Sequence, residues 1–193
     1  MTDEPAVRRL TEGIVAKRKR VDVLVNAVGG YSGVVPLWET DLKSFEQMLA
    51  LNVWPGFVLA RVIVPVMLKQ RSGVIVNVAS RAAVDHAAGA AAYAASKAAA
   101  VAMIDCLAAD LKGTGVRANS VLPSIIDTGA TRKAMPKADF SKWPKPADIA
   151  RVNHRTPHGS FMRISTAASV GSPVAAASRI NRNPARSRAI ATN

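Results

Sequence analysis

Buried-strand and amphipathic-helix patterns alternate along the first part of the chain. Apolar residues at helical spacing predict an amphipathic helix over residues 4–18, which begins beside Asp3 and ends in a run of basic residues. The β-branched run from Val21 to Asn26 leads into glycines and is typical of a strand that is buried on both faces. Residues 74–78 repeat this signature, and residues 116–122 give a weaker third strand.

Helical segments separate these strands. Residues 41–70 are mostly helical in pattern, and Pro55 with Gly56 marks either a kink or the first turn of a second helix, so one kinked helix and two helices both fit. Residues 90–112 form a long alanine-rich helix that the following glycines end. This alternation predicts an α/β fold, an open parallel sheet with helices on both faces.

The carboxyl ends of the predicted strands indicate where a ligand binds. Asn26, Ser80 and Pro123 lie at or just beyond these ends. Open parallel sheets bind their ligands at the carboxyl ends of the strands. Three successive loops are therefore expected to converge on one crevice.

Tyr93 and Lys97 are candidates for proton-transfer chemistry. Residues four apart share a helix face, so both side chains are expected to reach the strand end that carries Ser80. A neighbouring ammonium favours the phenolate, so Lys97 is expected to lower the pKa of Tyr93 toward neutral pH. Ser80 can hydrogen-bond a substrate oxygen, and Asn52 could hold a water that links Lys97 to solvent.

The alternative to this site is an ordinary helix surface. An isolated Tyr-x-x-x-Lys pattern is common on helices, where it usually means one packed ring and one solvated amine. Here Ser80 lies thirteen residues before Tyr93, Asn52 stands in Leu-Asn-Val, and a strand ends in Asn26. This combination favours a functional site over chance.

Composition and charge divide the chain near residue 151. The formal net charge is +13, and residues 151–193 contribute seven arginines with no lysine and no acid, a net of +7. We expect residues 1–150 to form one domain and residues 151–193 to be a low-complexity, disordered basic tail. Phe161 is the only aromatic residue of that tail, so nucleic-acid binding is not expected.

The cysteine content and the apolar runs indicate a cytoplasmic protein. The single cysteine, Cys106, excludes an internal disulfide. The apolar run from Val62 to Leu68 is far shorter than the roughly 20 residues that span a membrane. No secretory signal, membrane partner or metal site is expected.

Residues 3–150 resemble the short-chain dehydrogenase/reductase family. Val21 to Gly29 is similar to the family's fourth strand and its Asn-Asn-Ala-Gly motif, and Val116 to Thr128 is similar to its sixth strand and nicotinamide-lining segment. The resemblance implies a Rossmann-like doubly wound sheet, NAD or NADP as cofactor, and hydride transfer between nicotinamide and a small-molecule carbonyl or alcohol, with Tyr93 as acid or base. It implies catalytic roles for Asn52, Ser80, Tyr93 and Lys97. It implies cofactor contacts from Asn26, Ala27, Gly29, Tyr93, Lys97, Pro123, Ile126 and Thr128.

Part of the sequence resembles one branch of this family, the dihydropteridine reductases. The likeness lies in Gly29 to Gly33 and in Val121 to Trp143. That branch usually lacks the serine, so Ser80 favours a more ordinary carbonyl reductase. Ala27, Val28 and Ser124 depart from the residues usual in the family.

The family has further parts for which this sequence offers no match. A first strand, a Thr-Gly-x-x-x-Gly-x-Gly turn for the pyrophosphate and a second strand precede the matching segment in the family. The chain is therefore expected to be truncated, without its first βαβ unit and with an unpaired sheet edge exposed. The likeness stops after about residue 152. We interpret Met1 as an internal GTG codon read as a start, and the tail as the product of a frameshift.

Two functions fit this pattern. The chain is either an NAD(P)-dependent oxidoreductase or a catalytically inactive remnant that acts as an interaction partner of full-length homologues. Family members pair through helices that correspond to residues 41–70 and 90–112, which implies a homo-oligomer. NAD and NADP cannot be told apart, because the discriminating residues lie in the second strand. The substrate stays open, with Trp38, Trp143 and Met135 expected to form an apolar lid.

Overall fold

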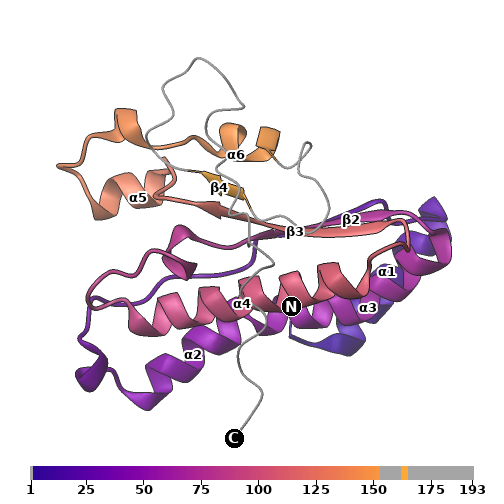
Figure 1. Ribbon diagram of the computed structural model, residues 1–193, viewed down its shortest axis with the longest axis horizontal. Helices are drawn as coiled ribbons and strands as arrows, with labels where there is room; N and C mark the ends of the chain where they lie inside the picture. Colours follow the sequence, from indigo (N-terminus) through magenta and orange to yellow (C-terminus); the bar gives the residue numbers. More distant parts are fainter. Residues whose placement is uncertain (1, 153–161, 165–193) are drawn as a thin grey trace, which may run out of the picture.

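A parallel four-stranded sheet forms the centre of the protein (Figure 1). The computed structural model describes residues 2–152 and 162–164. Within these residues the strand order is β1-β2-β3-β4, and each neighbouring pair is parallel. The strands are β1 (Val23–Asn26), β2 (Gly73–Val78), β3 (Val116–Pro123) and β4 (Met162–Ile164).

Helices cover both faces of this sheet (Figure 1). On one face, Val58 of helix α3 (Trp54–Gln70) and Ile104 of helix α4 (Ala91–Asp110) belong to the main core, which also contains Ile75 of β2. On the other face, Ile149 of helix α6 (Pro146–Val152) packs in a cluster with Val76 of β2. Neighbouring residues of a strand point to opposite faces, so Ile75 and Val76 pack in different core clusters. This confirms the predicted Rossmann-like α/β arrangement. The helices are α1 (Glu4–Arg18), α2 (Leu42–Asn52), α3 (Trp54–Gln70), α4 (Ala91–Asp110), α5 (Gly129–Ala134) and α6 (Pro146–Val152), with 3-10 turns η1 (Leu37–Glu39), η2 (Arg81–Ala83) and η3 (Phe140–Lys142).

The helical stretch over residues 41–70 is two helices. Asp41 caps α2 by accepting a hydrogen bond from the backbone N–H of Ser44 at 2.8 Å. Val53 separates α2 from α3, and Pro55 lies in the first turn of α3, where its missing N–H breaks no helical hydrogen bond. The two-helix alternative is therefore confirmed.

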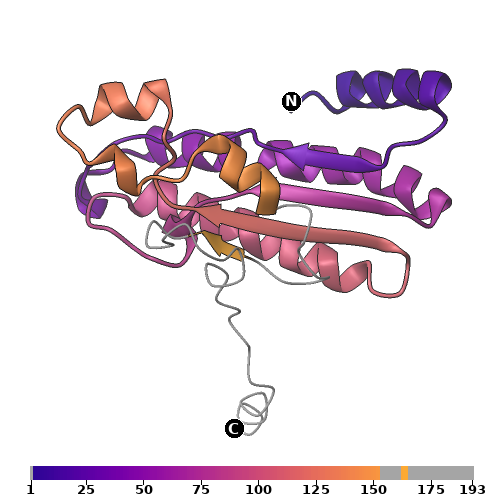
Figure 2. The same ribbon diagram turned by 90° about the horizontal axis from the view of Figure 1, so that it is seen from above.

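The outer edge of the sheet at β1 is open within the described residues. Val23 and Val25 are 57% and 51% exposed. They share one face of β1, while Leu24 points the other way and packs on the main core. Figure 2 shows α1 alongside this strand, where Val7 joins the same core as α3. One apolar face of this outer strand is therefore exposed.

β4 lies in the segment for which composition predicts disorder. Its three residues pair with β3, Val121 opposite Met162 and Pro123 opposite Ile164. The sequence did not predict this strand, because three residues carry too little periodicity to identify one. The predicted disorder of the remaining tail concerns residues outside those described.

Two helical stretches among the described residues are long and apolar enough to cross a membrane, Leu42–Gln70 and Ala91–Asp110. In each, 44% of the most hydropathic window is buried inside the fold. Core helices of soluble proteins pass the same test of length and composition. The test therefore gives only weak support for a membrane span.

Two glycines in the turn between α4 and β3 offer a matched stability test. Gly113 and Gly115 have φ values of 81° and 84°, in the left-handed region. A Cβ on Gly113 meets nothing within 4 Å, whereas a Cβ on Gly115 would overlap the carbonyl oxygen of Arg71. We expect Gly113→Ala to lower the free energy of unfolding by about 1 kcal/mol and Gly115→Ala by at least about 2 kcal/mol more. Chemical denaturation measures both, and equal losses would contradict the overlap.

Candidate functional site

Ser80, Tyr93 and Lys97 meet at the carboxyl end of β2. Ser80 follows the strand and caps η2, where its hydroxyl accepts from the backbone N–H of Ala82 at 3.2 Å. Tyr93 and Lys97 lie in the first two turns of α4, and the Lys97 ammonium is 5.9 Å from the centre of the Tyr93 ring. The Ser80 hydroxyl lies close enough to the Tyr93 phenol to lower its pKa. The structure therefore brings these three predicted residues together.

The environment of Tyr93 favours its neutral phenol. Burial raises the pKa of Tyr93 above its ordinary value, the hydrogen bond with Ser80 opposes this rise, and the neighbouring Tyr31 adds to it. The prediction that Lys97 lowers the pKa of Tyr93 is wrong in this structure. The reason is that burial removes water from around the phenolate, which raises the pKa by more than the contact with Ser80 lowers it.

Lys97 is a buried cation without a carboxylate partner in the part of the chain that the structure describes. Its residue is 6% exposed, and burial lowers the pKa of its ammonium from 10.5 to about 8. A lysine in this state exchanges its proton near physiological pH, unlike a solvated surface lysine. Lys97 is therefore suited to moving a proton as well as to binding a polar group.

The burial of Lys97 predicts a pH-dependent stability. Because the pKa is lower in the folded state than in the unfolded state, the unfolded chain binds more protons between pH 8 and 10.5. The free energy of unfolding is therefore expected to rise with pH across this window, by up to about 3 kcal/mol relative to Lys97→Met. Denaturant titrations of both proteins at several pH values measure the difference. If the difference in unfolding free energy between the two proteins did not change with pH, Lys97 would be as well solvated in the folded state as in the unfolded state.

Asn52 fixes the loop that follows β1. Its side-chain oxygen accepts from the N–H of Gly30 at 3.0 Å, and its amide donates to the carbonyl of Gly30 at 3.1 Å and to the Ser96 hydroxyl at 3.0 Å. Asn52 is buried at the end of α2. Its polar atoms thus hold the loop to α4, and a water relay from Asn52 to Lys97 stays a prediction.

Gly29 lies where Asn52 and Lys97 come together. A Cβ at Gly29 would stand 2.7 Å from the Asn52 side-chain oxygen and 2.8 Å from the Lys97 nitrogen. Distances this short leave no room for a side chain. The backbone of the loop therefore approaches both polar groups as closely as a glycine permits.

Asn26 is the first of three buried polar side chains that are hydrogen-bonded across neighbouring strands. Its amide donates to the Asn77 side-chain oxygen at 2.9 Å, and its own oxygen accepts from the N–H of Val28 at 3.3 Å. Asn77 in turn donates to the Ser120 hydroxyl at 3.5 Å. Sequence reasoning identified Asn26 but missed Asn77 and Ser120. The available signal was a polar residue inside an otherwise apolar strand.

The segment after β3 carries the remaining predicted cofactor residues. Pro123 ends the strand, and Ile126 packs against the cluster of Val76. The Thr128 hydroxyl caps α5 by accepting from the N–H of Thr131 at 3.2 Å. Ser124 has a buried hydroxyl with no hydrogen-bond partner among the described residues. Ala27 lies in the loop after β1, beside Asn26.

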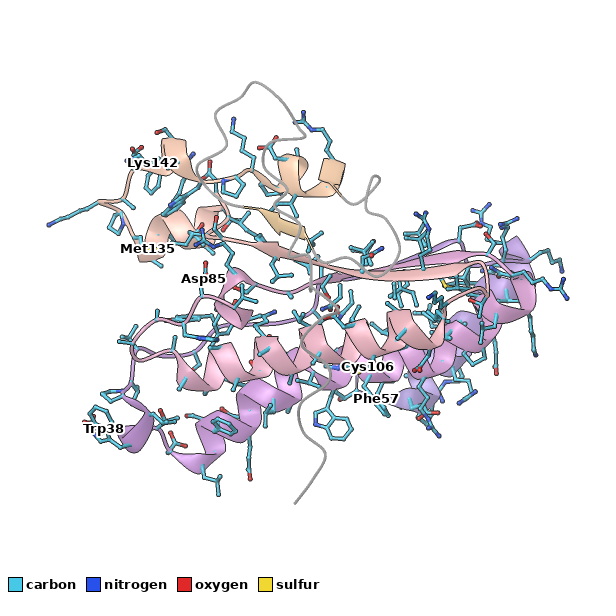
Figure 3. The ribbon with its side chains drawn as sticks, viewed as in Figure 1. Trp38, Phe57, Asp85, Cys106, Met135 and Lys142 are labelled. Carbon is cyan, nitrogen blue, oxygen red and sulfur yellow. The ribbon has the colours of Figure 1, made fainter. Side chains whose placement is uncertain are left out.

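The three residues of the expected apolar lid do not form one surface. Trp38 is 85% exposed on η1, and its indole N–H donates to Glu39 at 3.2 Å. Figure 3 shows Trp38 well apart from Met135 of the α5 segment and from Lys142. Trp143 instead packs on Phe140, with ring centres 5.0 Å apart. The turn η1 carries Trp38 outward, so this expectation is wrong for Trp38.

Comparison with known proteins identifies the family. Residues 1–139 match the sequence profile of the short chain dehydrogenases. The chain belongs to the short-chain dehydrogenase family. This confirms the resemblance and, with the parallel sheet, the predicted fold class.

Relatives of the chain within this family include reductases of different kinds. The chain is 32% identical over 160 residues to the 3-oxoacyl-(acyl-carrier-protein) reductase FabG of Thermotoga maritima, covering 79% of this chain. It is 29% identical over 177 residues to the dihydropteridine reductase of Dictyostelium discoideum, covering 86% of this chain and 76% of that protein. The solved structure of ElxO with NADP bound matches with a TM-score of 0.77 and 25% identity, covering 84% of this chain and 73% of ElxO.

The chain spans about half to two thirds of the length of the curated relatives first compared with it. It spans 65% of the length of the Thermotoga reductase, and 47% and 54% of two further bacterial dehydrogenases. The family is therefore shown, while the activity of this short-chain dehydrogenase is a separate question.

Proposed function

We propose that this short-chain dehydrogenase is an oxidoreductase that reduces a small-molecule carbonyl, or oxidises the matching alcohol, with NAD or NADP as cofactor. The observation that carries the proposal is the convergence of Ser80, Tyr93 and Lys97 at one strand end, with the Lys97 nitrogen 5.9 Å from the centre of the Tyr93 ring. The solved relative ElxO has NADP bound. With its single cysteine, we infer that the protein works in the cytoplasm.

The residues of the site fit the nicotinamide half of such a cofactor. The buried Ser124 hydroxyl lacks a partner among the described residues, and the buried Lys97 ammonium has no carboxylate beside it there. A carboxamide and ribose hydroxyls are groups that such donors bind. Because the Thr128 hydroxyl is engaged in capping α5, we assign the hydroxyl contact on this segment to Ser124. Asn26, Ala27, Gly29, Pro123 and Ile126 would shape the rest of the pocket.

The proton chemistry falls to the side chains already described. When bound, the nicotinamide ring supplies or accepts the hydride. In reduction, the neutral Tyr93 hydroxyl donates its proton to the substrate oxygen, a role that its raised pKa favours at neutral pH. Ser80 donates a hydrogen bond to the same oxygen as charge develops there. Lys97 returns the proton toward Tyr93, and Asn52 keeps the loop over Lys97 in place.

The alternative is a catalytically inactive chain that acts only as a binding partner of homologues. The sequence contains no Thr-Gly-x-x-x-Gly-x-Gly turn to hold a pyrophosphate. Fluorescence titration of the purified chain with NADH and with NADPH distinguishes the two functions, because the three tryptophans report binding. Saturable binding and turnover of a test ketone support the oxidoreductase. Absence of binding to both would favour the inactive partner.

A surface groove between α3 and α4 supports the proposal of a homo-oligomer. Phe57 of α3 and Cys106 of α4 lie on this groove, which has a volume of about 430 Å³ and a mostly apolar lining (Figure 3). Trp54 and Phe57 are exposed beside it and contact each other edge to face. Covering these rings with a second copy would bury apolar surface. Light scattering over a concentration series measures the oligomeric state, and a monomer throughout would contradict it.

A further inference from the structure

Tyr31 contacts the proposed acid of the reaction directly. The rings of Tyr31 and Tyr93 meet edge to face, with centres 5.0 Å apart and planes inclined at 81°. This is a favourable geometry for two aromatic rings. Tyr31 is nevertheless 59% exposed, so one part of its ring packs on Tyr93 while another part faces outward.

The loop that carries Tyr31 is held on both sides of this residue. Before it, Gly30 makes two hydrogen bonds to the buried Asn52. After it, the N–H of Val35 donates to the carbonyl of Gly89 at 3.0 Å, just before α4 begins. The same helix carries Tyr93, so the two anchors set the Tyr31 ring at a fixed place beside the Tyr93 ring. An exposed ring on an unanchored loop would not be fixed in this way.

We propose that Tyr31 is a positioning residue for Tyr93 and an aromatic wall of the substrate site, selecting carbonyl compounds with a flat apolar group next to the carbonyl. The selectivity rests on the proposed oxidoreductase function, whereas the positioning of Tyr93 does not. A flat group that lies on the outward part of the Tyr31 ring places its carbonyl beside Tyr93. Ser80 and Lys97 also lie beside Tyr93, the Lys97 nitrogen at 5.9 Å from the ring centre.

The composition of the chain makes the positioning role directly measurable. Tyr31 and Tyr93 are the only tyrosines, so Tyr31→Phe and Tyr31→Leu each leave Tyr93 as the sole tyrosine. Nuclear magnetic resonance of ring-labelled tyrosine then reports Tyr93 alone, without any need for turnover. We expect the Tyr93 ring signals of Tyr31→Phe to keep the shift that the edge-to-face ring causes. In Tyr31→Leu they are expected to move toward the values of a free tyrosine.

The selectivity is measured by comparing KM for two kinds of ketone. For a flat aromatic ketone, Tyr31→Leu is expected to raise KM about tenfold, whereas Tyr31→Phe keeps KM within about twofold of the wild type. For a small aliphatic ketone, the two variants should have the same KM. Unchanged Tyr93 ring signals in Tyr31→Leu would overturn the positioning role, and equal KM changes for both ketones would overturn the wall.

The experiments distinguish a failure of the oxidoreductase proposal from a failure of the proposal on Tyr31. If the wild type turns over no ketone, the oxidoreductase proposal fails, while the ring signals of the two variants still decide whether Tyr31 positions Tyr93. Binding of the flat ketone, followed through the same Tyr93 signals, then tests whether Tyr31 forms a wall of the substrate site. Binding that is equal in the Phe and Leu variants would overturn it.

Discussion

Turnover is expected to fall by at least about 100-fold when Tyr93 is replaced by phenylalanine, because a positioned acid or base contributes about 100- to 10,000-fold to such reactions. Phenylalanine keeps the ring, and with it the contact with Tyr31 and the place beside Lys97. It removes only the hydroxyl to which we assign the proton transfer, on the side chain whose pKa Ser80 lowers. The measurement is the initial rate of NADH or NADPH oxidation with a saturating ketone.

The controls separate lost chemistry from lost structure. Cofactor affinity and the thermal unfolding midpoint of Tyr93→Phe should stay close to the wild-type values. Thr114→Val removes a hydroxyl at the opposite end of the sheet, where it donates to the Leu111 carbonyl at 2.7 Å, and should leave kcat unchanged. A Tyr93→Phe variant with wild-type turnover would remove Tyr93 from its proposed role.

The strands and helices were predictable because their signals are local. β2 is a mostly apolar run that begins at Gly73, and α4 is a long run rich in alanine. β3 gives the weaker signal, because Arg117, Asn119 and Ser120 interrupt its apolar residues. The meeting of Ser80 with Tyr93 was predictable for a related reason, because the end of a strand and the first turn of the next helix lie together in a parallel sheet. Such relations depend on order along the chain rather than on detailed packing.

The parts that the sequence did not reveal depend on three-dimensional packing. The direction of the Tyr93 pKa follows from how much solvent the fold removes, and no spacing of residues contains that quantity. Tyr31 is 62 residues from Tyr93, and their contact depends on the loop after β1, which hydrogen bonds to Asn52 and to Gly89 hold in place. The outward position of Trp38 is likewise set by one 3-10 turn.

Replacing Gly29 by alanine is expected to damage both stability and catalysis. The added methyl would lie 2.7 Å from the Asn52 oxygen and 2.8 Å from the Lys97 nitrogen, and both side chains are buried. Moving either one disturbs a polar group that has no solvent to replace its contacts. We expect the free energy of unfolding to fall by about 2 kcal/mol and kcat by about 100-fold, since a displacement of about 1 Å suffices for such a loss.

Gly13 provides the matched control for this change. It lies inside α1, and a Cβ there meets nothing within 4 Å. Gly13→Ala is therefore expected to raise stability by about 0.5–1 kcal/mol and to leave kcat unchanged. Denaturant unfolding and initial rates of both variants make the comparison. If Gly29→Ala were as stable and as active as Gly13→Ala, the loop would not lie against Asn52 and Lys97, and Asn52 would lose its role of holding the loop over the site. A loss confined to Gly29→Ala would instead tie the catalytic geometry to one backbone position, because both variants add the same methyl group.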